Sequence, residues 1–367
     1  MDHAHVAEGI RRGTCLALIL FVAACAQLPM EQPAAALYQN PVMNSDFPDP
    51  AIMRAPDGWF YAYATQTTLG ERVINIQVAR TRDLVRWEHL GDALPQKPQW
   101  ASETQNFWAP DVIYDARQSR FLMYYSGQRS SKKDFCLAVA SAESPAGPFV
   151  DSGLPLACGT EHIDPMAFDD PESGRSFLYW GFRSIRVQEL APDRLRFAEG
   201  SVPVQILLPG LEQEYSRIVE GAWVTYRDGR YFLFYSGDYC CGAEPNYAVM
   251  VARADNPLGP FRRLAEENGG KRSVILERNE LWRAPGHNSV IRDAAGDDWM
   301  LYHAVDPRQP MLMDKVHGQV ARRVLMLDRI EYRDGWPRIT GDHPSTASRI
   351  APIFDWPAPQ GALTRLQ

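Results

Sequence analysis

Five segments of the chain share one pattern of apolar and polar positions: an acidic or His residue, a short apolar strand, a polar turn, and an aromatic-rich strand ending in Tyr. The segments run from Asp49 to Tyr63, Asp111 to Tyr125, Asp164 to Tyr179, Glu220 to Tyr235 and His287 to Tyr302. In every segment the first residue and the Tyr are separated by 14 or 15 positions. Two of the turns contain Asp57-Gly58 and Asp228-Gly229, a strong hairpin signal between apolar runs. The pattern therefore predicts five copies of one β-hairpin.

Third strands follow the hairpin in two of the copies. Residues 249–253 run into Asn-Pro-Leu-Gly-Pro-Phe at 256–261, and residues 139–141 run into Ser-Pro-Ala-Gly-Pro-Phe at 144–149. The repeated Tyr recurs after 62, 54, 56 and 67 positions, which leaves room for four strands and a loop in each unit. Five four-stranded units around an axis predict an all-β, five-bladed β-propeller whose innermost strands converge on a central cavity. A β-sandwich with coincidental Tyr spacing is the alternative.

Composition agrees with this fold class and excludes one class of partner. The 367 residues include 15 Phe, 15 Tyr, 10 Trp, 28 Pro and 26 Gly, a balance typical of a turn-rich β protein. With 38 Lys+Arg against 45 Asp+Glu, the net charge is −7. The chain lacks the basic excess that nucleic-acid binding requires, so we expect no nucleic-acid partner.

The N-terminal residues read as a targeting segment. Arg11 and Arg12 precede a mostly apolar run of 12 residues, Cys15 to Ala26, which is typical of a signal peptide and too short to span a bilayer. Within it Val22-Ala23-Ala24-Cys25 resembles a bacterial lipobox, although ordinary cleavage after Ala26 is the alternative. We therefore expect an exported protein, either a lipid-anchored periplasmic or outer-membrane lipoprotein or a secreted one, and a monomer. The predicted organisation is a signal peptide at 1–24, a tether at 25–37, one propeller domain at 38–355 and a tail at 356–367.

Four cysteines remain outside this segment: Cys136, Cys158, Cys240 and Cys241. Export permits disulfides. We predict a disulfide between the neighbours Cys240 and Cys241, at the rim of the site described next, where the sulfurs could pack on a sugar. Cross-links to Cys136 and Cys158, or two free thiols, are the alternatives.

The repeat alignment places four acids and one His at equivalent positions at one end of the propeller axis: Asp49, Asp111, Asp164, Glu220 and His287. Like charges that converge in a cavity raise one another's pKa, so that one carboxyl stays protonated while another stays ionised. Such a pair suits the cleavage of a glycosidic bond.

The residues around these positions resemble the successive signatures of glycoside hydrolase family 43. The signatures are Phe47-Pro48-Asp49-Pro50-Ala51, Phe107-Trp108-Ala109-Pro110-Asp111, Ile163-Asp164-Pro165, Glu220-Gly221-Ala222-Trp223 and Pro285-Gly286-His287-Asn288-Ser289. The resemblance covers roughly residues 38–340 and implies a five-bladed propeller acting on arabinose- and xylose-containing plant cell-wall polysaccharides. Tyr302-His303-Ala304 and Gly335-Trp336-Pro337 are most similar to arabinanase and arabinofuranosidase members.

The resemblance implies a role for each carboxyl. Asp49 is expected to be the general base, Glu220 the general acid, and Asp164 the group that tunes and orients the acid. The family inverts the anomeric centre, which needs the base and acid roughly 6.5–9.5 Å apart. Asp111 is expected to cap a turn or strand.

The expected substrate contacts are Phe107 and Trp108 as an apolar platform, Arg323 from the last blade, and the Cys240–Cys241 pair. Arg322 is the alternative register for the arginine, and Trp108 is alternatively a core residue. No cofactor is expected for the chemistry. The resemblance to arabinanases implies a hydrated calcium or sodium ion at His287 on the axis; a structural His is the alternative, and His303 is a second candidate ligand.

We therefore expect an inverting glycosidase that cleaves α-L-arabinofuranosidic linkages in arabinan or arabino-oligosaccharides. Three alternatives stay open: a β-xylosidase, a fructan-active propeller enzyme that retains configuration, and a carbohydrate-binding propeller without activity. Loops 66–77, 205–217 and 238–246 are expected to decide between endo and exo cleavage.

Overall fold

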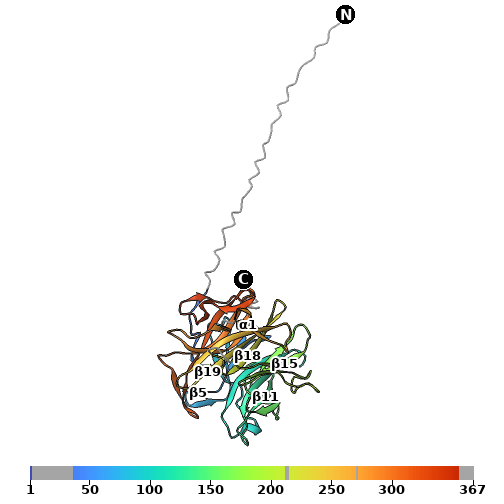
Figure 1. Ribbon diagram of the computed structural model, residues 1–367, viewed down its shortest axis with the longest axis vertical. Helices are drawn as coiled ribbons and strands as arrows, with labels where there is room; N and C mark the ends of the chain where they lie inside the picture. Colours follow the sequence, from blue (N-terminus) through green and yellow to red (C-terminus); the bar gives the residue numbers. More distant parts are fainter. Residues whose placement is uncertain (2–35, 211–214, 270–271, 355–367) are drawn as a thin grey trace. The chain divides into compact units, whose positions relative to one another are not determined.

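The structure is a computed structural model that describes Met1 and residues 36–210, 215–269 and 272–354 (Figure 1). The predicted signal peptide, Cys25, most of the predicted tether and the predicted tail lie outside these residues, so lipid attachment and export stay predictions. Among the described residues, no helix has both the length and the apolar character needed to cross a membrane.

Five antiparallel sheets follow one another along the chain, and each forms one blade of a five-bladed propeller. From the innermost strand outward, blade 1 contains β3 (Ala51–Arg54), β4 (Phe60–Ala64), β7 (Gln77–Thr81) and β8 (Glu88–Asp92); blade 2 contains β9 (Phe107–Asp115), β10 (Arg120–Gln128), β11 (Phe135–Ala142) and β12 (Val150–Asp151); blade 3 contains β14 (Met166–Asp169), β15 (Ser176–Trp180), β16 (Ile185–Glu189) and β17 (Val204–Leu207); blade 4 contains β18 (Val219–Arg227), β19 (Arg230–Tyr239), β20 (Asn246–Ala254) and β21 (Arg262–Arg263); and blade 5 contains β23 (Arg283–Arg292), β24 (Asp298–Val305), β27 (Arg323–Arg333) and β2 (Met43–Asp46). The innermost strands contact one another in the cyclic order β3, β9, β14, β18, β23 and back to β3. The predicted fold is thereby confirmed.

Short elements complete the described chain. They are β13 (Ala157–Gly159) on β11, β22 (Val274–Leu276) on β20, β28 (Trp336–Ile339) on β27, the pair β1 (Leu37–Tyr38) and β29 (Arg349–Ile350), the hairpins β5 (Thr67–Leu69) with β6 (Arg72–Ile74) and β25 (Met311–Asp314) with β26 (Gly318–Ala321), helix α1 (Leu264–Glu267), and the 3-10 turns η1 (Gln99–Ala101) and η2 (Thr340–Asp342).

The chain closes the ring with its own beginning, which the repeat pattern did not predict. Strand β2 is the outermost strand of blade 5, although it precedes blade 1 in sequence. The backbone N–H of Phe47 donates to the carbonyl of Arg323 at 2.7 Å. The side chain of Asn40 donates to the carbonyl of Leu327 and accepts from its N–H, both at 2.9 Å. The first described residues are therefore fixed to the last blade.

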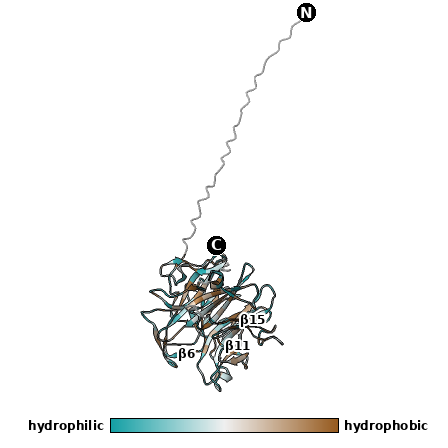
Figure 2. Ribbon diagram, in the orientation of Figure 1, coloured by the Kyte–Doolittle hydropathy of each residue, from teal (hydrophilic) through white to brown (hydrophobic). Residues whose placement is uncertain are grey.

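The hydrophobic core consists of five clusters, one between each pair of neighbouring blades. Figure 2 colours the ribbon by the hydropathy of each residue and shows apolar residues along strands of the propeller. Each repeated Tyr is fully buried in one of these clusters or beside it. The hydroxyl of Tyr63 donates to the carbonyl of Pro145, and that of Tyr179 to the carbonyl of Pro257, both at 2.6 Å. Pro145 and Pro257 hold the same place in the two Pro-x-Gly-Pro-Phe segments, and the Gly-Pro bond is cis in both. The two segments are therefore structural copies, as predicted.

Candidate active site

Three buried carboxyl groups, those of Asp49, Asp164 and Glu220, lie at one end of the innermost strands and form what we call the acidic cluster. Asp49 and Asp164 each stand two residues before an innermost strand, with a proline between, while Glu220 is the second residue of β18. The imidazole Nδ1 of His287 lies 3.4 Å from Oδ1 of Asp49 and 4.0 Å from Oδ2 of Asp164. The structure thus brings together the three carboxyls and the histidine that the repeat alignment placed at the axis.

Asp49 is held by partners from both sides of the ring closure. Its Oδ2 accepts a hydrogen bond of 2.6 Å from the hydroxyl of Thr65, and its Oδ1 accepts one of 2.8 Å from the guanidinium of Arg323. Burial raises the pKa of the Asp49 carboxyl, but opposing interactions, of which the charge of Arg323 is the largest, outweigh burial and hold the pKa well below its usual range. Asp49 is therefore ionised across the neutral range.

Glu220 has the opposite electrostatic setting. Burial raises the pKa of its carboxyl to about 7, and the charge of Asp49 adds to the shift. The hydroxyl of Tyr247 donates to Oε1 of Glu220 at 2.7 Å, which opposes part of this shift. Glu220 therefore holds a proton for part of the time near neutral pH, while Asp49 does not.

Asp164 stands between these two groups. Burial, followed by the charges of Glu220 and Asp49, raises the pKa of Asp164 well above its usual range. Its Oδ2 accepts the backbone N–H of Gly221 at 3.0 Å, so it holds the peptide that follows Glu220. The cluster thus combines one ionised carboxyl with two that can carry protons, an arrangement suited to concerted acid and base chemistry.

His303 is fully buried beside the cluster, and its protonation state follows from its contacts. The backbone N–H of Asp49 donates to Nδ1 of His303 at 3.1 Å, so Nδ1 is an unprotonated acceptor. Burial lowers the pKa of His303 to about 4, which agrees with a neutral ring. The separation of 3.3 Å between Nδ1 and Oδ1 of Asp49 is therefore not an ion pair near neutral pH.

The expected axial ion finds only part of a ligand set. Both side-chain polar atoms of Asn288 are buried without a hydrogen-bond partner in the described part of the chain, and this residue lines a small axial cavity with Asp49, Asp111 and His287. Calcium prefers six to eight oxygen ligands, so one amide oxygen and one imidazole would need several waters. No group of three or more His, Cys, Asp or Glu side chains among the described residues could hold a metal. The ion at His287 stays a prediction.

Asp111 does not take the position equivalent to Asp49 that the alignment predicted. It is the fifth residue of β9, and its Oδ2 accepts the backbone N–H of Ala167 in β14 at 2.8 Å. It therefore links blade 2 to blade 3 instead of capping its own strand, which corrects the expectation. Ala109, two residues before Asp111, takes the position equivalent to Asp49, because both residues have a left-handed backbone, with φ of 42° and 56°, and both precede a proline.

Of the predicted aromatic platform, Phe107 is excluded by its burial, and contact of Trp108 with the substrate stays a prediction. Phe107 has no exposed surface and packs against Tyr125 in the core between blades 1 and 2, so its ring cannot contact a ligand. Successive strand residues face opposite sides of a sheet, and Trp108 consequently leaves the core. It is half-buried and stacks on Phe135 with ring centroids 4.2 Å apart.

The structure resolves the register of the two arginines. Arg323 faces Asp49, with 12% of its side chain exposed, whereas Arg322 donates outward to the carbonyl of Asn44 at 2.6 Å. Arg323 is thus the arginine at the acidic cluster, and its contact with the substrate stays a prediction.

The predicted disulfide between Cys240 and Cys241 is present, whereas the pairing of Cys136 with Cys158 was not predicted. One disulfide joins Cys240 to Cys241, and a second joins Cys136 to Cys158 across strands β11 and β13. Cys240 and Cys241 follow β19, in which Ser236 is the register partner of Glu220. The loop after β19 therefore lies at the end of blade 4 that carries Glu220. The adjacent Tyr239 is 54% exposed.

Two hairpins from opposite sides of the ring closure meet at this end of the propeller. Thr68, in the hairpin β5–β6, donates from its hydroxyl to Oδ2 of Asp314 in the hairpin β25–β26 at 2.6 Å. Nε2 of His317 lies 2.7 Å from Nε2 of Gln66 and 3.1 Å from the carbonyl of Gln105. Loop 66–77, which we expected to help decide between endo and exo cleavage, therefore contacts the hairpin β25–β26 of blade 5.

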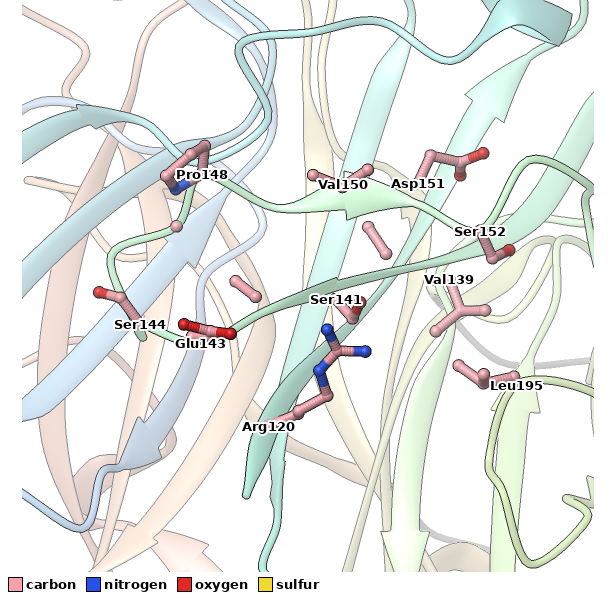
Figure 3. A pocket seen from close by; sticks show the side chains of 13 residues that line it. Arg120, Val139, Ser141, Glu143, Ser144, Pro148, Val150, Asp151, Ser152 and Leu195 are labelled. Atoms are coloured by element: carbon pink, nitrogen blue, oxygen red, sulfur yellow. The ribbon is translucent and has the colours of Figure 1, made fainter. Parts of the chain in front are cut away.

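A surface pocket that is larger than the axial cavity lies away from the acidic cluster. It is lined by the outer strands of blade 2 with Leu195 of blade 3, including Arg120, Glu143 and Asp151 (Figure 3). None of its lining residues belongs to the acidic cluster. We place the chemistry at the cluster, because buried carboxyls with opposed pKa shifts converge there.

Comparisons with known proteins identify related sequences. The sequence profile of glycosyl hydrolases family 43 matches residues 38–337. The chain is 27% identical over 346 residues to a xylan 1,3-beta-xylosidase of a Vibrio species, covering 87% of this chain but only 61% of the xylosidase. It is 26% identical over 355 residues to a probable arabinan endo-1,5-alpha-L-arabinosidase D of Emericella nidulans, covering 88% of each chain.

Solved structures show the same architecture. A thermostable family-43 glycoside hydrolase superimposes with a TM-score of 0.70 at 27% identity, covering 87% of this chain and all of that one. An alpha-L-arabinanase from Cellvibrio cellulosa superimposes with a TM-score of 0.65 at 22% identity, covering 80% of this chain and 95% of the arabinanase.

Proposed function

The chain belongs to glycosyl hydrolase family 43, and on that basis we propose that this glycoside hydrolase cleaves α-L-arabinofuranosidic linkages in arabinan or arabino-oligosaccharides with inversion. The observation that carries the mechanism is that the pKa values of two buried carboxyls are shifted in opposite directions. Asp49 is held ionised beside Arg323, whereas burial raises the pKa of Glu220 to about 7. One group can therefore accept a proton while the other donates one.

In the proposed reaction, the Asp49 carboxylate removes a proton from a water whose oxygen attacks the anomeric carbon. Glu220 gives its proton to the glycosidic oxygen as the bond between that oxygen and the anomeric carbon breaks. The products are a sugar of inverted configuration and a free hydroxyl on the leaving chain. Asp164 aids this step by fixing the Gly221 peptide next to Glu220.

The choice of arabinan is supported by the relatives that carry arabinan-active names. An exo-alpha-(1->5)-L-arabinofuranosidase of Cellvibrio japonicus joins the Emericella protein in this group, at 24% identity over 322 residues. The xylosidase relative favours the alternative, a β-xylosidase.

A substrate panel separates these proposals. The protein is incubated with linear arabinan, branched arabinan, arabinoxylan, a fructan, and chromogenic arabinoside and xyloside, and the products are sized. Release of arabinose or arabino-oligosaccharides supports the proposal, and xylose release alone contradicts it. Proton NMR of the first product distinguishes inversion from the retention expected of fructan-active enzymes. Binding without any product would support the non-catalytic alternative.

The pH dependence of kcat/KM is expected to be one-sided near neutrality. Glu220 must be protonated to act, so kcat/KM should fall about tenfold per pH unit above its pKa of about 7. Asp49 must be ionised, and its pKa lies well below the usual value, so the fall on the acidic side should begin only below about pH 4. The profile is measured with a chromogenic arabinoside between about pH 3 and pH 9. If kcat/KM already falls when the pH is lowered through about pH 5, the assignment of Asp49 as the base is contradicted.

We propose that the Cys240–Cys241 pair contacts the sugar chain beyond the cleaved bond. Changing both cysteines to Ser should raise KM for arabino-oligosaccharides about three- to tenfold, the loss expected for one apolar contact, while kcat for a small chromogenic arabinoside stays unchanged. Changing Cys136 and Cys158 to Ser is the matched control, since that disulfide joins two strands of blade 2. An unchanged KM for the Cys240 and Cys241 variant, with the disulfide verified in the wild type by non-reducing mass spectrometry, would exclude the contact.

A further inference from the structure

A ring of five hydrogen bonds links each blade to the next at the end of the propeller that carries the acidic cluster. In each bond a backbone N–H at or near the start of one innermost strand donates to a side chain of the preceding blade. The bonds are Asp49 N–H to Nδ1 of His303 at 3.1 Å, Ala109 N–H to Oγ1 of Thr65 at 2.9 Å, Asp164 N–H to Oγ of Ser126 at 2.9 Å, Gly221 N–H to Oδ2 of Asp164 at 3.0 Å, and His287 N–H to Oγ of Ser236 at 2.8 Å.

All five donor residues have a left-handed backbone. Their φ angles are 56° at Asp49, 42° at Ala109, 58° at Asp164, 60° at Gly221 and 48° at His287. Residues with a Cβ rarely adopt this conformation, which persists only where the surroundings over-determine it and which clusters at functional sites. The hydrogen bond to each N–H is such a constraint. The ring therefore fixes the direction in which the side chains of Asp49, Asp164 and His287 leave the backbone.

Blade 3 shows that the ring is maintained when the usual acceptor is missing. In the other blades the acceptor lies one or two residues after the repeated Tyr, whereas in blade 3 the residue after Tyr179 is Trp180, which has no acceptor atom. Asp164 supplies the acceptor instead. One member of the acidic cluster thus completes the ring and at the same time holds the peptide next to Glu220.

We propose that this ring is a positioning device for the reaction, with His303 as the positioning residue of Asp49 and Ser126 that of Asp164; the inference rests on the proposed function. Asp49 is held at three atoms: its N–H by His303, its Oδ2 by Thr65 and its Oδ1 by Arg323. His303 acts through an unprotonated Nδ1, so only an acceptor at that point can replace it.

The test compares variants that remove one acceptor with variants that keep it. His303→Leu removes the acceptor, and His303→Asn places a carbonyl oxygen near the position of Nδ1. Ser126→Ala and Ser236→Ala each remove a single oxygen and keep the fold accessible to measurement if His303→Leu does not fold. Ser289→Ala is the matched control, because the buried hydroxyl of Ser289 has no partner in the described part of the chain.

With a chromogenic arabinoside, His303→Leu, Ser126→Ala and Ser236→Ala should lower kcat about 10–100-fold, the usual effect of a misplacement near 1 Å, with KM changed less than about threefold. His303→Asn should recover most of the loss, and Ser289→Ala should match the wild type. Folded Ser126→Ala and Ser236→Ala variants with wild-type kcat, or equal losses in both His303 variants, would overturn the ring's role while leaving the proposed function intact. A wild type inactive on the whole substrate panel would overturn both.

Discussion

Replacing Asp49 by Ala should lower kcat by about 10²–10⁴, and replacing Glu220 by Gln should do the same, because each variant removes one proton transfer from the transition state. The two losses should differ in their dependence on the leaving group. An activated leaving group such as 4-nitrophenolate needs little protonation, so it should partly restore the Glu220→Gln variant. It should not restore Asp49→Ala, in which the attacking water has lost its base.

Asp111→Asn is the matched control for these variants. Asp111 is buried on the same axis, and burial raises the pKa of its carboxyl to about 7, so Asn resembles the protonated form and can still accept the Ala167 N–H. Activity of Asp111→Asn should remain within a few-fold of the wild type. Near-normal activity of a folded Asp49→Ala or Glu220→Gln protein would disprove the assigned roles.

Arg323→Ala should reduce both stability and activity, because it leaves the Asp49 carboxylate buried without its cationic partner. Removing one partner of a buried ion pair costs about 3–5 kcal/mol of unfolding free energy. The same change raises the pKa of Asp49, since burial then acts without the opposing guanidinium. As the base must be ionised, the acidic limb of kcat/KM should move to higher pH.

Arg322→Ala provides the internal control, since its side chain bonds Asn44 and not the cluster. Its thermal midpoint and its pH profile should stay close to those of the wild type. Equal effects of the two substitutions on the acidic limb, measured on folded protein, would exclude an electrostatic role specific to Arg323.

The fold was predictable because the propeller repeats its hydrophobic pattern. The spacing of the five Tyr residues gives the number of residues available to each blade. Each of these residues is buried in or beside a cluster between blades. The convergence of Asp49, Asp164 and Glu220 follows from the same periodicity. Chain closure by β2 was not predictable in this way, since β2 is a single strand outside the repeat.

The predictions for Asp111 and Phe107 were wrong for local reasons. The repeat alignment matched Asp111 to Asp49 as an acidic residue, whereas the residue of blade 2 with the same left-handed backbone and the same following proline is Ala109. For Phe107, the motif alone does not tell which face of β9 the ring occupies. The acceptors Ser126, Ser236 and His303 directly follow a repeated Tyr in the sequence, and of these only His303 was expected to have a role, as a candidate ion ligand. Their partners are backbone groups of other blades, which no side-chain pattern encodes.

Closure by β2 bears on when during synthesis the enzyme can become active. Asp49 follows β2 by three residues and is among the first parts of the propeller to leave the ribosome, whereas Arg323 and His303 are among the last. A nascent chain that ends before β24 holds the proposed general base but neither its cationic partner nor the acceptor of its N–H. We therefore expect hydrolytic activity only after blade 5 has been synthesised. In a truncated or half-translated chain, Asp49 lacks both the guanidinium that keeps it ionised and the acceptor of its N–H.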